Sequence, residues 1–100
     1  MDNVYMTYTV NALIPAEVLN YCLCMVRNLE AQIKEPDYFM VFNISKYNDM
    51  LAVELTTERP EYYNVAYIMC NKKVEEKIYC IRDKEDDNKN MYTFLFPDEY

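Results

Sequence analysis

The stretch Pro15–Lys34, PAEVLNYCLCMVRNLEAQIK, decides the fold. Its apolar side chains recur at intervals of three and four residues, which places them on one side of an α-helix. These side chains belong to Leu19, Cys22, Val26, Leu29 and Ile33. Pro15 suits the first turn of a helix, and Pro36 lies where a helix would have to stop. The stretch therefore predicts an amphipathic helix of about five turns that packs one face against another layer.

Alternation of apolar and polar residues predicts strands on both sides of this helix. Before it, Val4–Val10 has the pattern of a half-buried strand. After it, Tyr38–Lys46 and Met50–Thr57 flank the short polar turn Tyr47-Asn48-Asp49, which is a hairpin signature. Because Tyr38–Phe42 is apolar on both faces, we expect it to be a central strand with the helix on one side.

The second half of the chain predicts further strands. Tyr63–Cys70 and Val74–Arg82 are expected to form a second hairpin around Asn71-Lys72-Lys73, and a charged loop, Asp83–Asn90, to lead to a last strand, Met91–Phe96. The order β-α-β-β-β-β-β over residues 1–100 predicts a single α+β domain. Its expected architecture is a mostly antiparallel sheet of about five to six strands with one long amphipathic helix packed on one face. A single helix leaves the second face of the sheet partly uncovered.

The composition argues against several classes of enzyme. The 100 residues include no His and no Gly. Without His, the commonest general base and the commonest metal ligand are missing. Without Gly, the phosphate-cradling loops of P-loop and Rossmann proteins cannot form in their usual way. Ser45, the one serine, lies in a predicted strand with no base to activate it. We therefore expect neither an enzymatic activity nor a cofactor.

Neither the cysteines nor the acidic residues predict a metal site. On a helix, Cys22 and Cys24 would point their thiols about 200° apart, and Cys70 and Cys80 would not face each other across the expected second hairpin. We expect Cys22, Cys70 and Cys80 to be small buried hydrophobes and Cys24 to be an exposed thiol. Neighbouring Glu75 and Glu76 would point to opposite faces of a strand. The other two candidate sets, Glu58 with Glu61 and Asp83 with Glu85, Asp86 and Asp87, fall in predicted loops, where ordinary solvated charge accounts for them.

Tyrosine content and charge are the two features that point to binding. The chain has 11 tyrosines and a formal net charge of −7. Periodicity places Tyr47, Tyr62, Tyr63 and Tyr100 outside the core, beside acidic residues, and binding surfaces are enriched in tyrosine. The negative charge opposes direct contact with DNA or RNA and favours a basic partner. A charge of this size is also ordinary for solubility, so both interpretations stay open.

These features favour an inhibitor that binds a basic protein surface, such as that of a nucleic-acid-handling enzyme, and occludes it with carboxylates standing where phosphates would lie. In character, though not in sequence, small acidic proteins of this kind resemble phage or mobile-element products such as anti-CRISPR and anti-restriction proteins. The residues expected to contact the partner are Glu58, Glu61, Tyr62, Tyr63, Asp83, Glu85, Asp86, Asp87, Asp98, Glu99 and Tyr100.

Two other functions remain open. An immunity protein or antitoxin that neutralises a cationic toxin has nearly the same sequence requirements, and a structural homodimer would cover the bare sheet face with a second copy. No apolar run approaches the ~20 residues of a membrane helix, and Met1-Asp2-Asn3 carries an acid where a secretory signal carries a base. We therefore expect a cytoplasmic protein without a membrane partner, in the host cytoplasm if it is encoded by a phage.

Overall fold

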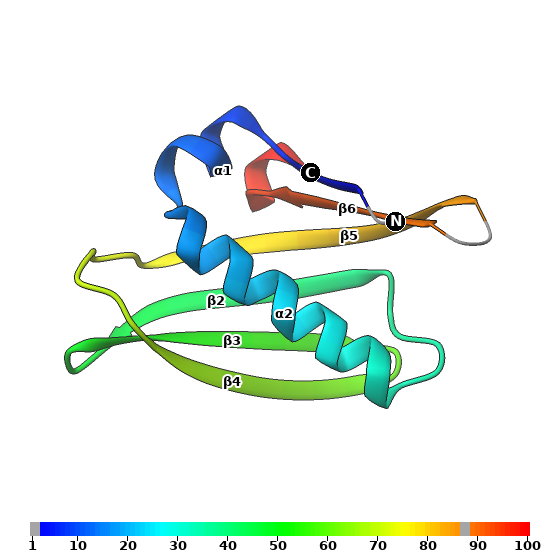
Figure 1. The fold of residues 1–100 in the computed structure, drawn as a ribbon, viewed down its shortest axis with the longest axis horizontal. Coiled ribbons are helices and arrows are strands. Elements are labelled where there is room, and N and C mark those ends of the chain that lie inside the picture. Colours follow the sequence, from blue (N-terminus) through cyan, green and yellow to red (C-terminus); the bar gives the residue numbers. More distant parts are fainter. Residues whose placement is uncertain (1–2, 87–88) are drawn as a thin grey trace.

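The computed structural model describes the backbone of residues 3–86 and 89–100; the side chains of residues 85 and 86 lie outside that description. The chain forms a six-stranded sheet with two α-helices (Figure 1). The elements in chain order are β1 (Asn3–Met6), α1 (Tyr8–Leu13), α2 (Ala16–Gln32), β2 (Phe39–Tyr47), β3 (Met50–Glu58), β4 (Glu61–Met69), β5 (Glu76–Asp86), β6 (Lys89–Leu95) and the 3₁₀ turn η1 (Pro97–Glu99).

The predicted class is confirmed at the level of an α+β fold with a mostly antiparallel sheet. The strand order is β1-β6-β5-β2-β3-β4, in which only the β1–β6 pair is parallel among the described strands. As expected, β2 is central, because it pairs with both β3 and β5. The hairpin between β2 and β3 is also confirmed, with Asn48 at φ 53° in its turn. In Figure 1, α2 crosses one face of the sheet diagonally.

The predicted first strand is wrong in its second half. β1 ends at Met6, and the chain turns into α1, a helix that the sequence interpretation did not include. Thr7 is the N-cap of α1, and its Oγ1 accepts a hydrogen bond from the Val10 backbone N–H at 3.3 Å. Because a threonine N-cap favours the start of a helix at the next residue, the alternation of apolar and polar residues up to Val10 does not correspond to a continued strand.

The predicted second hairpin around Asn71-Lys72-Lys73 is also wrong. β4 does not pair with β5: it lies at the edge of the sheet beside β3, and the chain crosses over so that β5 pairs with β2. The register Phe42–Ile78 joins residues far apart in sequence, and no local turn signal reports such pairing.

The expected loops are shorter than predicted because the strands are longer. β5 continues through Asp83 to Asp86 and β6 begins at Lys89, so most of the predicted loop Asp83–Asn90 lies in a strand pair. Likewise, β3 and β4 are separated only by Arg59 and Pro60, whose peptide bond is cis. Charged residues do not by themselves predict a loop, because the exposed end of a hairpin accommodates them equally well.

The core lies between α2 and the sheet. Six side chains of α2 are buried, including those of Val26 and Leu29. On the facing strands, the side chains of Phe42 and Phe94 are at most 1 % exposed. The two phenylalanine rings are 6.2 Å apart and tilted. The predicted apolar stripe of α2 is therefore the side that faces the sheet. Among the residues that the structure describes, no helix is long and apolar enough to cross a membrane.

A polar network ties the end of α2 to the sheet. The buried Tyr92 hydroxyl donates to the Glu30 carboxylate at 2.7 Å, and Arg82 lies 3.6 Å from the same carboxylate. An Arg82 Nη donates to the Pro36 carbonyl at 2.7 Å. The network therefore joins α2, the segment before β2, and strands β5 and β6.

Tyr92→Phe is expected to lower the free energy of unfolding by about 1–3 kcal/mol, because it removes a buried donor from a charged acceptor. Urea unfolding followed by circular dichroism measures the change. Tyr21→Phe, on the exposed side of α2, is the control and should leave the midpoint nearly unchanged. A midpoint for Tyr92→Phe equal to that of the control would show that the network adds no stability.

Candidate protein-binding surface

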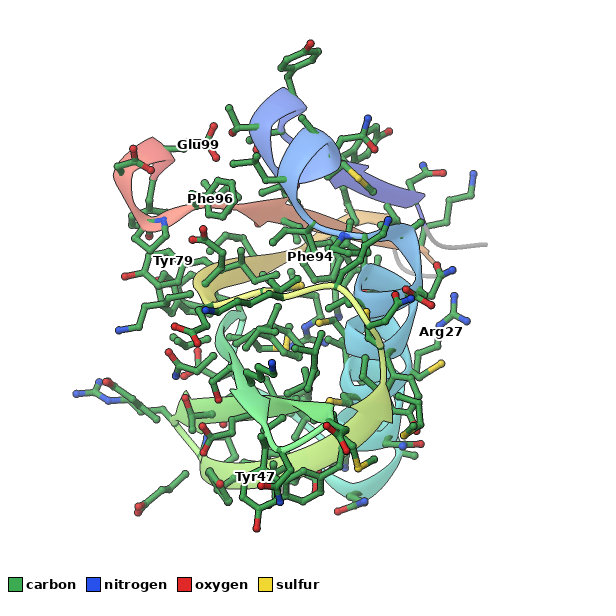
Figure 2. All side chains as sticks on the ribbon, turned by 90° about the vertical axis from the view of Figure 1, so that its left-hand side faces the viewer. Arg27, Tyr47, Tyr79, Phe94, Phe96 and Glu99 are labelled. Carbon is green, nitrogen blue, oxygen red and sulfur yellow. The ribbon has the colours of Figure 1, made fainter. Side chains whose placement is uncertain are left out.

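The face of the sheet opposite α2, called the outer face here, has no helix over it in the described chain (Figure 1). Strand alternation and the ladder registers assign to it the odd-numbered residues of β1, β2, β4, β5 and β6 and the even-numbered residues of β3, up to the register shift that follows Lys84. In Figure 2, Tyr79 projects away from α2, whereas Phe94 lies between the sheet and the helix. The expectation of an uncovered second face thus corresponds to the structure.

Aromatic side chains gather in two groups on this face. Tyr47 and Tyr67 have ring centroids 5.2 Å apart. Tyr100 packs edge-on against Phe39 and Tyr79, at 5.3 and 5.9 Å. Tyr47 and Tyr100 remain more than half exposed despite these contacts, at 55 % and 69 %. A tyrosine whose ring is held by a neighbour loses little conformational entropy on binding, so these are suitable anchors for a partner.

The charges of the outer face are mostly negative. Its described ionisable residues other than tyrosine are the acids Glu54, Glu58, Glu61 and Asp83 and the bases Lys77 and Lys89. The ratio of four acids to two bases is only slightly above the 17 to 10 of the whole chain. The face that carries the exposed tyrosines therefore also carries an excess of acid.

The acids are densest where the β3–β4 hairpin turns. Glu58 and Glu61 are both exposed and lie directly opposite each other in the ladder. Like charges in such a position are unfavourable until a cation comes between them. Next to them, a hollow of about 360 Å³ opens on the outer face. Its lining includes Tyr38, Phe39 and Glu58, and also Asp37 and Arg59, so it offers aromatic rings together with charges of both signs.

Asp37 fixes the backbone at this end of the sheet. Its carboxylate accepts hydrogen bonds from the N–H groups of Phe39 at 3.0 Å, Glu58 at 3.3 Å and Arg59 at 3.1 Å. Partial burial works against the charged form, but these three donors and the Arg59 guanidinium outweigh it and hold the pKa of Asp37 below its ordinary value. Asp37 therefore stabilises the fold in its ionised form.

The sign of this shift predicts a pH dependence. A lowered folded-state pKa adds stability above the unfolded pKa of about 3.9, and this stability is lost as the pH falls through the folded pKa. Asp37→Asn should therefore reduce the stability at pH 7, with a difference from the wild type that shrinks by pH 3. Urea unfolding at both pH values measures this. A difference that is equal at both pH values would contradict the role of the charge.

The structure brings some of the predicted partner-binding residues together. Glu58, Glu61 and Tyr63 share the outer face, and the Tyr63 hydroxyl donates to the Glu54 carboxylate at 2.6 Å. Tyr62 does not belong with them: it lies on the inner face, half-buried against the core, because neighbours in a strand point to opposite sides. The expectation that Tyr62 lies on the surface beside Tyr63 is therefore wrong.

The predicted acidic group after Arg82 is described only in part. Asp83 is exposed and lies on the outer face, at the same end of the sheet as the β3–β4 turn. Glu85 and Asp86 lie on β5, but their side chains are outside the described part of the structure, as is the whole of Asp87. The topology thus places Asp83 and the β3–β4 acids at one end of the sheet.

The predicted group at residues 98–100 is divided. Asp98 and Glu99 are near the start of β5, at the opposite end of the sheet, where they line a cavity of about 500 Å³ with Glu76 and Lys77. The Glu99 carboxylate is already engaged. It accepts hydrogen bonds from Thr9 Oγ1 at 2.6 Å, from Thr7 Oγ1 and from the Phe96 N–H, and these lower its pKa. Figure 2 shows Glu99 above Phe96 in this corner. Glu99 therefore links η1 to α1 through these hydrogen bonds.

The four cysteines are free thiols in different surroundings. Cys22 and Cys80 are buried as predicted, and burial raises the pKa of both, that of Cys22 to about 12. Cys24 is exposed as expected, but Cys70 is only half-buried and its thiol lies 3.3 Å from a Glu17 oxygen. Within residues 3–86 and 89–100, no group of three or more His, Cys, Asp or Glu side chains could hold a metal ion.

Comparison with known proteins supports the fold and leaves the function open. No protein-family description and no curated protein matches the chain. A solved structure of a protein of unknown function from Enterococcus faecalis is similar, with a TM-score of 0.75 and 14 % sequence identity. The similarity covers 98 % of this chain and 90 % of the other chain. The two proteins therefore share the fold over nearly their full lengths.

Proposed function

We propose that this protein is a binding protein without catalytic activity, which docks a basic surface of another protein on the outer face of its sheet and blocks that surface. The observation that carries the proposal is the coincidence of exposed tyrosines and an excess of acid on the one sheet face that no described α-helix covers. Protein interfaces combine aromatic anchors with complementary charge in this way.

The tyrosines would supply most of the affinity. Tyr47 and Tyr100 present large rings whose orientation is already restrained by neighbouring rings, and such rigid aromatic residues are the commonest hot spots. The acids would orient the approaching partner and raise the rate of association, since a negative field steers a positive partner. The hollow beside Glu58, which aromatic rings and charges of both signs line, would receive a polar side chain of the partner.

The proposed target is a nucleic-acid-handling protein of a bacterial defence system, which makes the chain an inhibitor of the anti-CRISPR or anti-restriction type that acts in the host cytoplasm. A basic groove that binds nucleic acid offers the charge that the outer face complements. The carboxylates of Glu58, Glu61 and Asp83 follow one end of the sheet, where they can take the places of phosphates. Occupation of such a groove excludes its nucleic acid.

A pair of substitutions that removes two carboxylate charges tests the acidic part of the surface. Glu58→Gln combined with Glu61→Gln is expected to weaken partner binding about 10-fold, which corresponds to two exposed ion pairs of up to about 0.7 kcal/mol each. The control is Glu75→Gln combined with Glu76→Gln, which removes the same net charge from exposed residues elsewhere and should change binding much less.

The partner is found by capture on the immobilised wild-type protein from a bacterial lysate, with mass spectrometry. A true partner is retained by the wild type and the control and is reduced on the Glu58/Glu61 variant. Its affinity should fall steeply between about 50 and 200 mM salt. Equal retention by all three proteins, together with salt-independent binding, would refute the charge-based mechanism.

A further inference from the structure

The cavity of about 500 Å³ beside η1 has no role in the proposed docking of a partner. Three parts of the chain line it: Thr9 and Leu13 of α1, Glu76 and Lys77 at the start of β5, and residues 96–99 around η1. Pockets that bind small molecules typically measure about 300–1,000 Å³. The cavity therefore has the size of a site for a small ligand.

One wall of the cavity is already held in place. The Glu99 carboxylate accepts hydrogen bonds from Thr7 Oγ1 at 2.9 Å and from Thr9 Oγ1 at 2.6 Å. It also accepts one from the Phe96 N–H at 2.8 Å, and Figure 2 shows Glu99 next to Phe96 at this corner of the molecule. Because these bonds order the wall in advance, a ligand that binds against it loses less affinity to conformational entropy.

Three other charged side chains line the cavity without a partner. Those of Glu76, Lys77 and Asp98 are exposed, and none of them makes a hydrogen bond or an ion pair with another described residue. As neighbours on a strand, Glu76 and Lys77 point to opposite faces of the sheet, Glu76 to the side of α2 and Lys77 to the outer face. The cavity thus offers two free carboxylates and one free ammonium group.

The rest of the lining is mainly apolar. It consists of Leu13, Phe96 and Pro97, together with the Thr9 side chain. Leu13 is 63 % exposed at the end of α1, so a ligand in the cavity would remove apolar surface of this side chain from water, which is favourable. The lining therefore suits a ligand that combines charged groups with a hydrocarbon chain.

We propose that this cavity binds a free basic amino acid, arginine or lysine. Such a molecule carries two cationic groups and one carboxylate on a hydrocarbon chain, which matches the free charges of the lining. The cationic groups face Glu76 and Asp98, the carboxylate faces Lys77, and the chain lies against the apolar wall. With Glu99, the lining has three acids and one base, so its net charge also favours a ligand of net positive charge.

Related ligands match the lining less well. An apolar amino acid leaves one of the two free carboxylates without a cation. An acidic amino acid brings a second negative charge to a lining that is already negative. A diamine without a carboxylate leaves Lys77 unmatched and is repelled by it. The site therefore discriminates through unmatched and like charges as well as through attraction.

A ligand series on the wild-type protein tests each match, with binding followed by nuclear magnetic resonance of the ¹⁵N-labelled chain. Arginine is expected to bind saturably with a Kd of about 1 mM or below. The shifted amide signals should be those of the lining residues. Citrulline, in which a neutral group replaces the guanidinium, and argininamide, which has no carboxylate, should each bind about 3-fold more weakly.

Variants test the assignment of each charge. Glu76→Gln combined with Asp98→Asn is expected to weaken arginine binding about 10-fold. The matched control, Glu75→Gln combined with Asp49→Asn, removes two exposed acids that do not line this cavity, and it should keep the wild-type affinity. Lys77→Gln should weaken the binding of arginine but not that of argininamide, which has no carboxylate for Lys77 to meet.

Several results would overturn the proposal. One is the lack of saturable shifts with arginine up to about 10 mM, ten times the expected Kd. Another is equal binding of arginine by the wild type and the Glu76/Asp98 variant, with the amide spectrum of the free variant verifying its fold. Equal affinity for N-acetylargininamide, which keeps the side chain but neither charge of the α-carbon, would assign the cavity to a basic side chain of another protein instead.

Discussion

Phe42→Ala is expected to lower the free energy of unfolding by about 3–5 kcal/mol, the typical cost of truncating a fully buried phenylalanine. Phe42 has no exposed surface and its ring packs 6.2 Å from that of Phe94. It lies on the central strand, beneath α2. The remaining cavity would be lined by residues of both layers, which can close it only by moving the helix. Since small domains unfold at about 5–15 kcal/mol, this loss is a large part of the total.

The matched substitution is Tyr47→Ala, on the same strand but on the outer face. Tyr47 is 55 % exposed, so its truncation should change the free energy of unfolding by less than about 1 kcal/mol. Urea unfolding of both variants measures the contrast between the two sheet faces. Comparable losses for Phe42→Ala and Tyr47→Ala would mean that the outer face is packed in solution, contrary to the structure.

The second large effect concerns binding. Tyr47→Ala combined with Tyr100→Ala should weaken partner binding by about 30- to 700-fold, because two hot-spot aromatics together contribute about 2–4 kcal/mol. Isothermal titration calorimetry with the captured partner measures the change.

The control for this variant removes two exposed tyrosines from the helical side of the molecule. Tyr8 and Tyr21 lie on α1 and α2 and are 86 % and 44 % exposed. Tyr8→Ala with Tyr21→Ala should leave the affinity within about 3-fold of the wild type. If instead this control abolishes binding and Tyr47→Ala with Tyr100→Ala does not, the partner docks on the helices.

The sequence was most informative where structure is local. The apolar spacing of Pro15–Lys34 predicted α2 to within two residues at its ends, and the turn around Asn48 predicted the β2–β3 hairpin. It failed where long-range pairing decides the structure. β5 pairs with β2 and not with β4, its neighbour in the sequence. Residues 71–73 do not predict this, because the pairing of strands that are distant in sequence leaves no local signal.

The candidate surface was predicted in the same uneven way. Glu58, Glu61 and Tyr63 were identified from charge and tyrosine content, and the structure brings them to one face. Tyr67 and Tyr79 were missed, although strict alternation along their strands would have placed them on the same face as Tyr63 once the inner face was known. Tyr62 was included wrongly because the strand was predicted to begin only at Tyr63, whereas β4 begins at Glu61 and its alternation turns Tyr62 to the inner face.

Site-specific photo-cross-linking tests the central proposal most directly. A benzophenone side chain replaces Tyr47 on the outer face in one protein and Tyr21 on α2 in another, and each is irradiated in the lysate. A covalent adduct with a basic protein is expected from position 47 and none from position 21. An adduct from position 21 alone would contradict it and would place binding on the helical side.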